Sequence, residues 1–92
     1  MYRPYKEFVA GLLATIKEHQ SSVPSPCISV YVKSENMKEF FDECREAIRG
    51  IPGSMWVYNL EHLQTLFMNH FKVEVKVRHQ ESEGQESIVV HS

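Results

Sequence analysis

The feature that most constrains the fold is a strict alternation of apolar and charged residues near the C-terminal end of the sequence. Three valines alternate with four charged residues in the order Lys72, Val73, Glu74, Val75, Lys76, Val77 and Arg78. Because successive side chains of a strand point to opposite faces, this segment predicts a strand with one apolar and one charged face. Such a strand is typical of a sheet that is covered on one side and open to water on the other.

Two further segments also have the pattern of strands. Residues 27–33 alternate between an apolar set and a more polar set, and they are rich in β-branched side chains. Ile88–Val90 follows a polar loop at residues 80–85, so the C-terminal part of the chain predicts an antiparallel β-hairpin. The four bulky residues Met55–Tyr58 are ambiguous between an apolar connection and a short strand, and we expect the strand.

Three segments have the three- and four-residue apolar spacing of helices, and they cover residues 4–20, 34–49 and 59–71. Pro4 suits the first turn of the first helix, and Ser34 and Asn59 are expected N-caps of the second and third. Gly50 is the expected end of the second helix.

Together these segments predict one α+β domain over residues 1–92, in the order α-β-α-(β)-α-β-β. We expect a small, mainly antiparallel sheet of three or four strands that ends in the C-terminal hairpin. The three helices are expected to pack on one face of this sheet.

Composition restricts the classes of function without selecting one. The chain has 92 residues, of which 42% are hydrophobic and 24% charged, and its formal net charge is −2. A dedicated nucleic-acid binder is usually basic, although a local basic patch can oppose the total charge. The N-terminal residues lack the apolar core of a signal peptide, and no apolar run approaches a membrane span. We therefore expect a cytoplasmic protein without membrane contact, in which Cys27 and Cys44 are free thiols.

The residues that could support catalysis or metal binding are scattered. The two cysteines and five histidines do not occur at CxxC, HxxxH or HExxH spacing, so we expect neither a metal ion nor another cofactor. Cys44 belongs to the apolar stripe of the second helix, and nothing near Cys27 in the sequence indicates a lowered thiol pKa. We therefore expect no catalytic residue and a protein that is not an enzyme.

Two charged surfaces are the candidate macromolecule-binding sites. On the solvent-exposed face of the sheet the candidates are Tyr31, Lys33, Lys72, Lys76 and Arg78. Val89 and His91 of the last strand can join them. An aromatic ring among cations can stack on a base and neutralise phosphates, or it can contact an acidic protein surface. On the second helix the candidates form an acidic strip of Glu39, Asp42, Glu43 and Glu46. Each surface has the alternative interpretation of an ordinary solvated face.

Aromatic residues outside these surfaces have two possible roles. Trp56 and Tyr58 are of the types that anchor interfaces, but in so small a domain they are more often part of the core.

The leading hypothesis for function is a small non-enzymatic interaction protein, an inhibitor or adaptor that binds a protein or nucleoprotein complex. One example of this class is a phage-encoded inhibitor of a bacterial nucleic-acid-binding defence complex. The analogy rests only on the small size of the chain and its lack of motifs. The alternatives are a direct nucleic-acid-binding domain that uses the basic and aromatic sheet face, and a small cysteine-dependent enzyme. The chain is expected to be a monomer or a homodimer.

Overall fold

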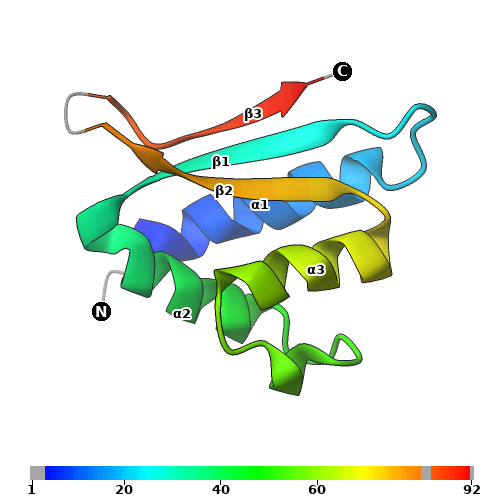
Figure 1. Cartoon of the computed structure of the whole chain (residues 1–92), viewed down its shortest axis with the longest axis horizontal. Helices are drawn as coiled ribbons and strands as arrows, with labels where there is room; N and C mark the ends of the chain where they lie inside the picture. Colours follow the sequence, from blue (N-terminus) through cyan, green and yellow to red (C-terminus); the bar gives the residue numbers. More distant parts are fainter. Residues whose placement is uncertain (1–3, 82–83, 92) are drawn as a thin grey trace.

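The arrangement of helices and strands was obtained from a computed structural model, which describes residues 4–81 and 84–91 (Figure 1). The elements follow in the order α1 (Pro4–His19), β1 (Cys27–Lys33), η1 (Ser34–Asn36), α2 (Met37–Ala47), η2 (Ser54–Trp56), α3 (Leu60–Phe71), β2 (Glu74–Gln80) and β3 (Ser87–His91). The elements η1 and η2 are single turns of 3₁₀ helix. This order confirms the predicted α+β class and the three helices.

The sheet has three strands in the order β2-β1-β3, so β1 lies in its centre. β1 runs parallel to β2, with Ile28 opposite Val75, and antiparallel to β3, with Ile28 opposite Val90. The predicted C-terminal hairpin is therefore wrong, because β2 and β3 each pair with β1 rather than with each other. β1 is the strand whose apolar side chains are fully buried, and the central position gives it a neighbour on both edges.

All three helices lie on one face of the sheet, as predicted (Figure 1). The core forms between the two layers. Its buried residues come from every helix, from β1 and β2, and from a few flanking positions: Tyr5, Val9, Leu12, Ile16, Ile28, Val30, Val32, Phe40, Cys44, Ile48, Val57, Leu63, Leu66, Phe67, Phe71, Val73 and Val75. In the described part of the chain, no helix lies on the opposite face of the sheet (Figure 1).

A side-chain cap marks the start of α3, whereas the predicted cap of α2 has another role. The side chain of Asn59 accepts a hydrogen bond from the backbone N–H of His62 at 2.9 Å, which confirms Asn59 as the N-cap of α3. Ser34, in contrast, is not the N-cap of α2. It opens the η1 turn and its hydroxyl contacts Nδ1 of His79 at 2.9 Å, so that α2 begins only at Met37.

The segment Met55–Tyr58 does not form the predicted strand. Gly53 has a φ of 90°, in the left-handed region, and it leads the chain into the η2 turn, where Trp56 N–H donates to the Gly53 carbonyl at 3.0 Å. Val57 reaches the core with 2% of its surface exposed. Trp56 and Tyr58 are 65% and 62% exposed, so the expectation that they belong to the core is also wrong.

A carboxylate fastens the start of β3 to the rest of the fold. Glu86 accepts hydrogen bonds from the Tyr5 hydroxyl, from the Lys33 N–H at 2.8 Å and from Asn36 Nδ2 at 3.4 Å. Burial opposes the charged form of Glu86, but these hydrogen bonds outweigh it and lower the pKa of the carboxyl. Burial and then the Glu86 carboxylate raise the pKa of Tyr5. The contacts join α1, the end of β1 and η1 to the chain that enters β3.

We expect Glu86→Gln to lower the free energy of unfolding by about 1–3 kcal/mol at pH 7, because an amide cannot replace all the acceptor positions of the carboxylate. The folded-state pKa of Glu86 lies below its unfolded value, so its contribution is present above about pH 4 and is lost as pH falls through the folded pKa. Urea denaturation at pH 7 and at pH 3 measures both effects, with the exposed Glu81→Gln as the control. A difference between Glu86→Gln and wild type that is equal at the two pH values would contradict the assignment.

Candidate functional site

The first candidate surface is the face of the sheet that the helices leave uncovered, which we call the open face. Its residues are set by alternation along each strand and by the register between strands. β1 places Tyr31 on this face, and the register puts Arg78 of β2 and Ser87 of β3 on either side of it. Two residues earlier in β1, Ser29 lies between Lys76 of β2 and Val89 of β3. The open face thus brings together four of the five predicted residues, namely Tyr31, Lys33, Lys76 and Arg78.

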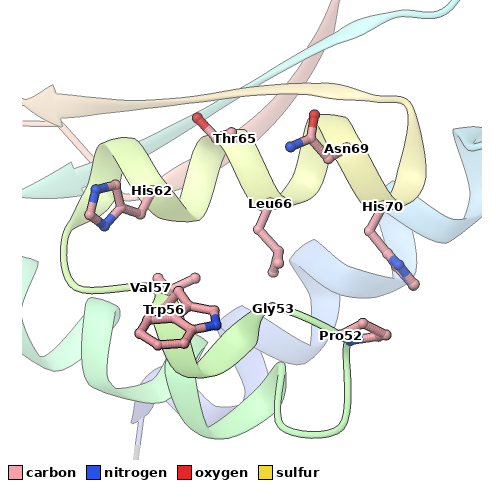
Figure 2. A pocket seen from close by; sticks show the side chains of 9 residues that line it. All are labelled: Pro52, Gly53, Trp56, Val57, His62, Thr65, Leu66, Asn69 and His70. Carbon is pink, nitrogen blue, oxygen red and sulfur yellow. The ribbon is translucent and has the colours of Figure 1, made fainter.

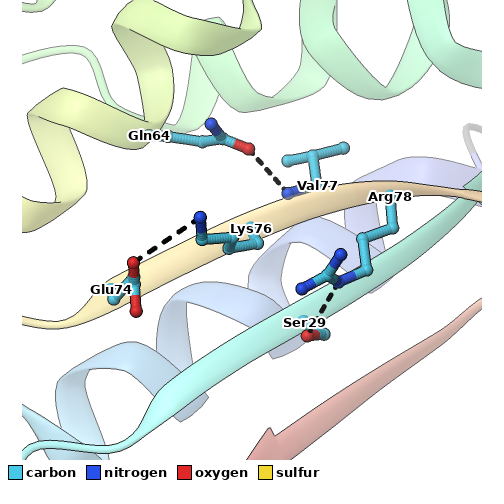
Figure 3. A network of polar contacts seen from close by, with 6 residues as sticks. All are labelled: Ser29, Gln64, Glu74, Lys76, Val77 and Arg78. Atoms are coloured by element: carbon cyan, nitrogen blue, oxygen red, sulfur yellow. Dashed lines mark hydrogen bonds and ion pairs between the residues drawn. The ribbon is translucent and has the colours of Figure 1, made fainter.

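A buried serine contacts two basic side chains of the open face. Ser29 is only 1% exposed although it points away from the helices. Arg78 Nε donates to Ser29 Oγ at 3.3 Å (Figure 3). Nε2 of His91 lies 3.1 Å from the same oxygen. These contacts hold the guanidinium and the imidazole close to the sheet, and the register places Arg78 opposite the half-buried Tyr31.

The open face is positively charged although the whole chain has a formal net charge of −2. The strands place Lys33, Lys76 and Arg78 on it, against the single carboxylate of Glu74. Lys76 Nζ lies 3.8 Å from Glu74 Oε2, and both side chains are about half exposed, so the pair is weak (Figure 3). An anionic partner can therefore compete with Glu74 for Lys76.

Lys72 does not belong to this group. It lies before β2 and ends α3 with a φ of 61°, and its carbonyl accepts a hydrogen bond from Ser25 Oγ at 2.9 Å. The alternation of the sequence continues through Lys72, but the helix extends far enough that the strand begins only at Glu74.

The structure divides the residues of the predicted acidic strip. Glu39, Asp42 and Glu46 are exposed on α2, whereas Glu43 is 6% exposed and faces the core. Asp42 pairs with Lys38 at 2.8 Å, and Glu46 pairs with Arg49 at 3.3 Å. Two of the three exposed carboxylates thus have a cation beside them, Lys38 on α2 and Arg49 just after its C-terminal end.

The second candidate surface was not among the predicted binding sites. A groove with a volume of about 530 Å³ lies between α3 and the η2 turn (Figure 2). We call it the aromatic groove, and it is lined by Pro52, Gly53, Trp56, Val57, His62, Thr65, Leu66, Asn69 and His70. Leu66 points from α3 towards the η2 turn, while Trp56 and His62 lie at one end and Pro52 and His70 at the other (Figure 2).

Large exposed side chains also lie next to Trp56 in the sequence. Met55 in the η2 turn and Tyr58 just after it are 70% and 62% exposed. The backbone N–H of Tyr58 donates to Nδ1 of His62 at 3.2 Å, which ties the chain after the η2 turn to α3. A signal for this exposure exists in the sequence. Between the turn at Gly53 and the helix cap at Asn59 the chain is too short to bury every bulky residue.

Neither cysteine has the environment of a catalytic nucleophile. Burial raises the pKa of Cys44 to about 12. Burial, and then the nearby Glu74 carboxylate, raise the pKa of Cys27 above its ordinary value, more than Arg78 and Lys76 lower it. Within residues 4–81 and 84–91, no three His, Cys, Asp or Glu side chains are grouped to hold a metal ion. In the same part of the chain, no helix has the length and apolar character needed to cross a membrane.

We expect both thiols to react slowly with iodoacetamide near neutral pH, because the thiolate is the reactive form and both pKa values are raised. Cys44 should react only when the protein unfolds. Mass spectrometry of timed samples at pH 7.5 measures the rates, with a small free thiol as the reference. Alkylation of Cys27 that is faster than the reference would favour the cysteine-dependent enzyme instead.

Comparison of the chain with protein-family models, with curated proteins and with solved structures finds no match. Function is therefore inferred from the geometry of the open face and the aromatic groove.

Proposed function

We propose that the chain is a non-enzymatic interaction protein, an adaptor or inhibitor that binds a protein partner through the aromatic groove. The observation that carries this proposal is the exposure of three large side chains around one turn, namely Met55, Trp56 and Tyr58. Exposed aromatic and methionine side chains are enriched at protein interfaces, where a few aromatic anchors supply most of the binding energy.

The composition of the groove supports a protein partner. Val57 and Leu66 give it an apolar base, and Thr65 and Asn69 add polar groups along α3 (Figure 2). An apolar centre with a polar rim is the usual arrangement of an interface. The volume of about 530 Å³ is sufficient for one or two side chains of a partner.

The groove is also held in place before any partner binds. Val57 N–H donates to the Ser54 carbonyl at 3.2 Å, which closes the η2 turn, and Val57 itself is anchored in the core. The Tyr58–His62 hydrogen bond fixes the chain where it enters α3. A preformed site loses less conformational entropy on binding than one that must be ordered.

We expect Trp56→Ala to abolish capture of the partner while leaving the fold intact. Truncation of an aromatic hot spot costs about 2 kcal/mol or more of binding, whereas an exposed side chain contributes about 0.5 kcal/mol or less to stability. Affinity capture from a lysate of the source organism, with mass spectrometry of the bound proteins, compares wild type, Trp56→Ala and the exposed-site control Val23→Ala.

A further variant, Tyr31→Ala, distinguishes the two surfaces. A partner that is lost with Tyr31→Ala but retained by Trp56→Ala would assign binding to the open face and reject the groove. Trp56 is the only tryptophan of the chain, so its fluorescence emission should also shift to shorter wavelength when the identified partner is added.

The second candidate function is direct binding of single-stranded nucleic acid by the open face. It is favoured by the position of Tyr31 beside Arg78 and in the same sheet face as Lys33 and Lys76. A tyrosine ring can stack on a base of any sequence, and adjacent cations neutralise the phosphates. The open and helix-free side of the sheet leaves room for an extended strand (Figure 1).

For this candidate we expect affinity for a labelled single-stranded oligonucleotide to fall steeply with salt. Each phosphate contact contributes about 0.7 to the slope of log K against log salt, so the double variant Lys76→Gln and Arg78→Gln should reduce the slope by about 1.4. The control is Lys6→Gln with Lys17→Gln, which removes two exposed cations from α1. Absence of binding at low salt in fluorescence anisotropy, or an equal effect of the two double variants, would exclude the candidate.

A further inference from the structure

The two edges of the sheet differ in their protection. At the outer edge of β2, the Val77 N–H donates to Gln64 Oε1 of α3 at 2.7 Å, so a helix side chain occupies a position that another strand would need (Figure 3). The same strand carries the charged residues Glu74, Lys76 and Arg78. A covered, charged edge of this kind prevents pairing with a further strand.

The outer edge of β3 has none of these features. β3 is the last strand in the sheet order, and among the described residues no strand pairs with its outer side. Its sequence Ser-Ile-Val-Val-His contains no lysine, arginine, carboxylate, proline or glycine. An edge strand without these protective residues presents unpaired backbone N–H and C=O groups that can pair with another strand.

The apolar side chains of β3 are exposed on both faces of the sheet. Val89 lies on the open face opposite Ser29 and is 38% exposed. Val90 lies on the helix face opposite Ile28 and is 39% exposed, although Ile28 itself is fully buried. The apolar layer between sheet and helices thus continues to the edge of the sheet, where nothing in the described part of the chain covers it.

We infer that two copies of this chain pair through β3, antiparallel and about a two-fold axis at Val89. In this register Ser87 of one copy lies opposite His91 of the other, and Ile88 lies opposite Val90. Each cross-strand pair joins residues of the same character, and no like charges face each other. The interface is therefore complementary to itself, as a two-fold symmetric contact requires.

A second copy of the chain is favoured as the occupant of the β3 edge, over an extended segment of another protein, because it gives an assembly with no further open edge. The paired sheet has the strand order β2-β1-β3-β3-β1-β2, so both of its outer edges are the β2 edges that Gln64 occupies. Pairing thereby buries the unprotected edge of each copy and leaves no equivalent edge for a third. Assembly stops at the dimer and does not continue into a fibre.

Analytical ultracentrifugation of the full chain at about 100 µM tests the inference, and we expect a mass of twice 10.7 kDa. Val89→Lys places two introduced cations opposite each other on the axis, so it should raise the dissociation constant of the dimer by about tenfold or more. The matched control is Val23→Lys, which makes the same chemical change at a residue that is 96% exposed. Far-UV circular dichroism verifies that each variant is folded.

A cross-linking experiment tests the register and does not depend on the behaviour of the lysine variant. In a Cys27→Ser background, Val89→Cys should form a covalent dimer with oxidised glutathione, because directly opposed residues of antiparallel strands approach the spacing of a disulfide. Val23→Cys in the same background is the control. The remaining thiol, Cys44, is buried in the core.

Two results would overturn the inference. The first is a monomeric wild type at all concentrations up to about 1 mM, which is also the result expected if the edge receives a strand from another protein. The second is a folded Val89→Lys variant that remains dimeric, which would place the contact elsewhere. If Val89→Lys does not fold, the cross-linking experiment decides instead. Cross-linking of Val89→Cys no faster than that of Val23→Cys would then overturn the inference.

Discussion

The structure depends on the burial of three β-branched side chains of one strand. Ile28, Val30 and Val32 of β1 are each fully inaccessible to solvent, because helices cover one side of the strand and β2 and β3 flank it. Since strand side chains alternate, fixing these three residues towards the helices also fixes Tyr31 and Lys33 on the opposite face. A register shift of one residue would exchange the two sets and expose the core.

Alternation is a local property of one strand. It therefore predicts which side chains share a face of the sheet, but it does not predict which strands lie next to each other. The period of two correctly assigned Tyr31 and Arg78 to the same face of the sheet. The hairpin was expected because β2 and β3 are adjacent in the chain, whereas the structure gives the central position to β1. The contact that supports this order, from the Glu86 carboxylate to the Lys33 N–H, joins residues far apart in sequence and leaves no periodic signal.

Two residues whose burial differs from the expectation do so for similar physical reasons. Glu43 follows Phe40 by three positions, so the helix brings it to the face that is buried, although its charge suggested exposure. Trp56 shows the reverse case, because its apolar character suggested burial. The short path from Gly53 to Asn59 allows Val57 to reach the core and leaves Trp56 and Tyr58 outside it. In both cases backbone geometry overrides side-chain hydrophobicity.

Helix α3 connects the features that are relevant to binding. On one side it contributes Gln64, which closes the β2 edge, and on another it contributes Leu66 and His62 to the aromatic groove. Because Gln64 of α3 occupies the β2 edge, the dimer that we infer pairs through β3, at the opposite edge of the sheet. The η2 turn lies beyond the helix layer, away from the sheet (Figure 1). Pairing through β3 therefore leaves both grooves accessible, and a dimer with two grooves would bind a repeated or symmetric partner more tightly than either copy alone.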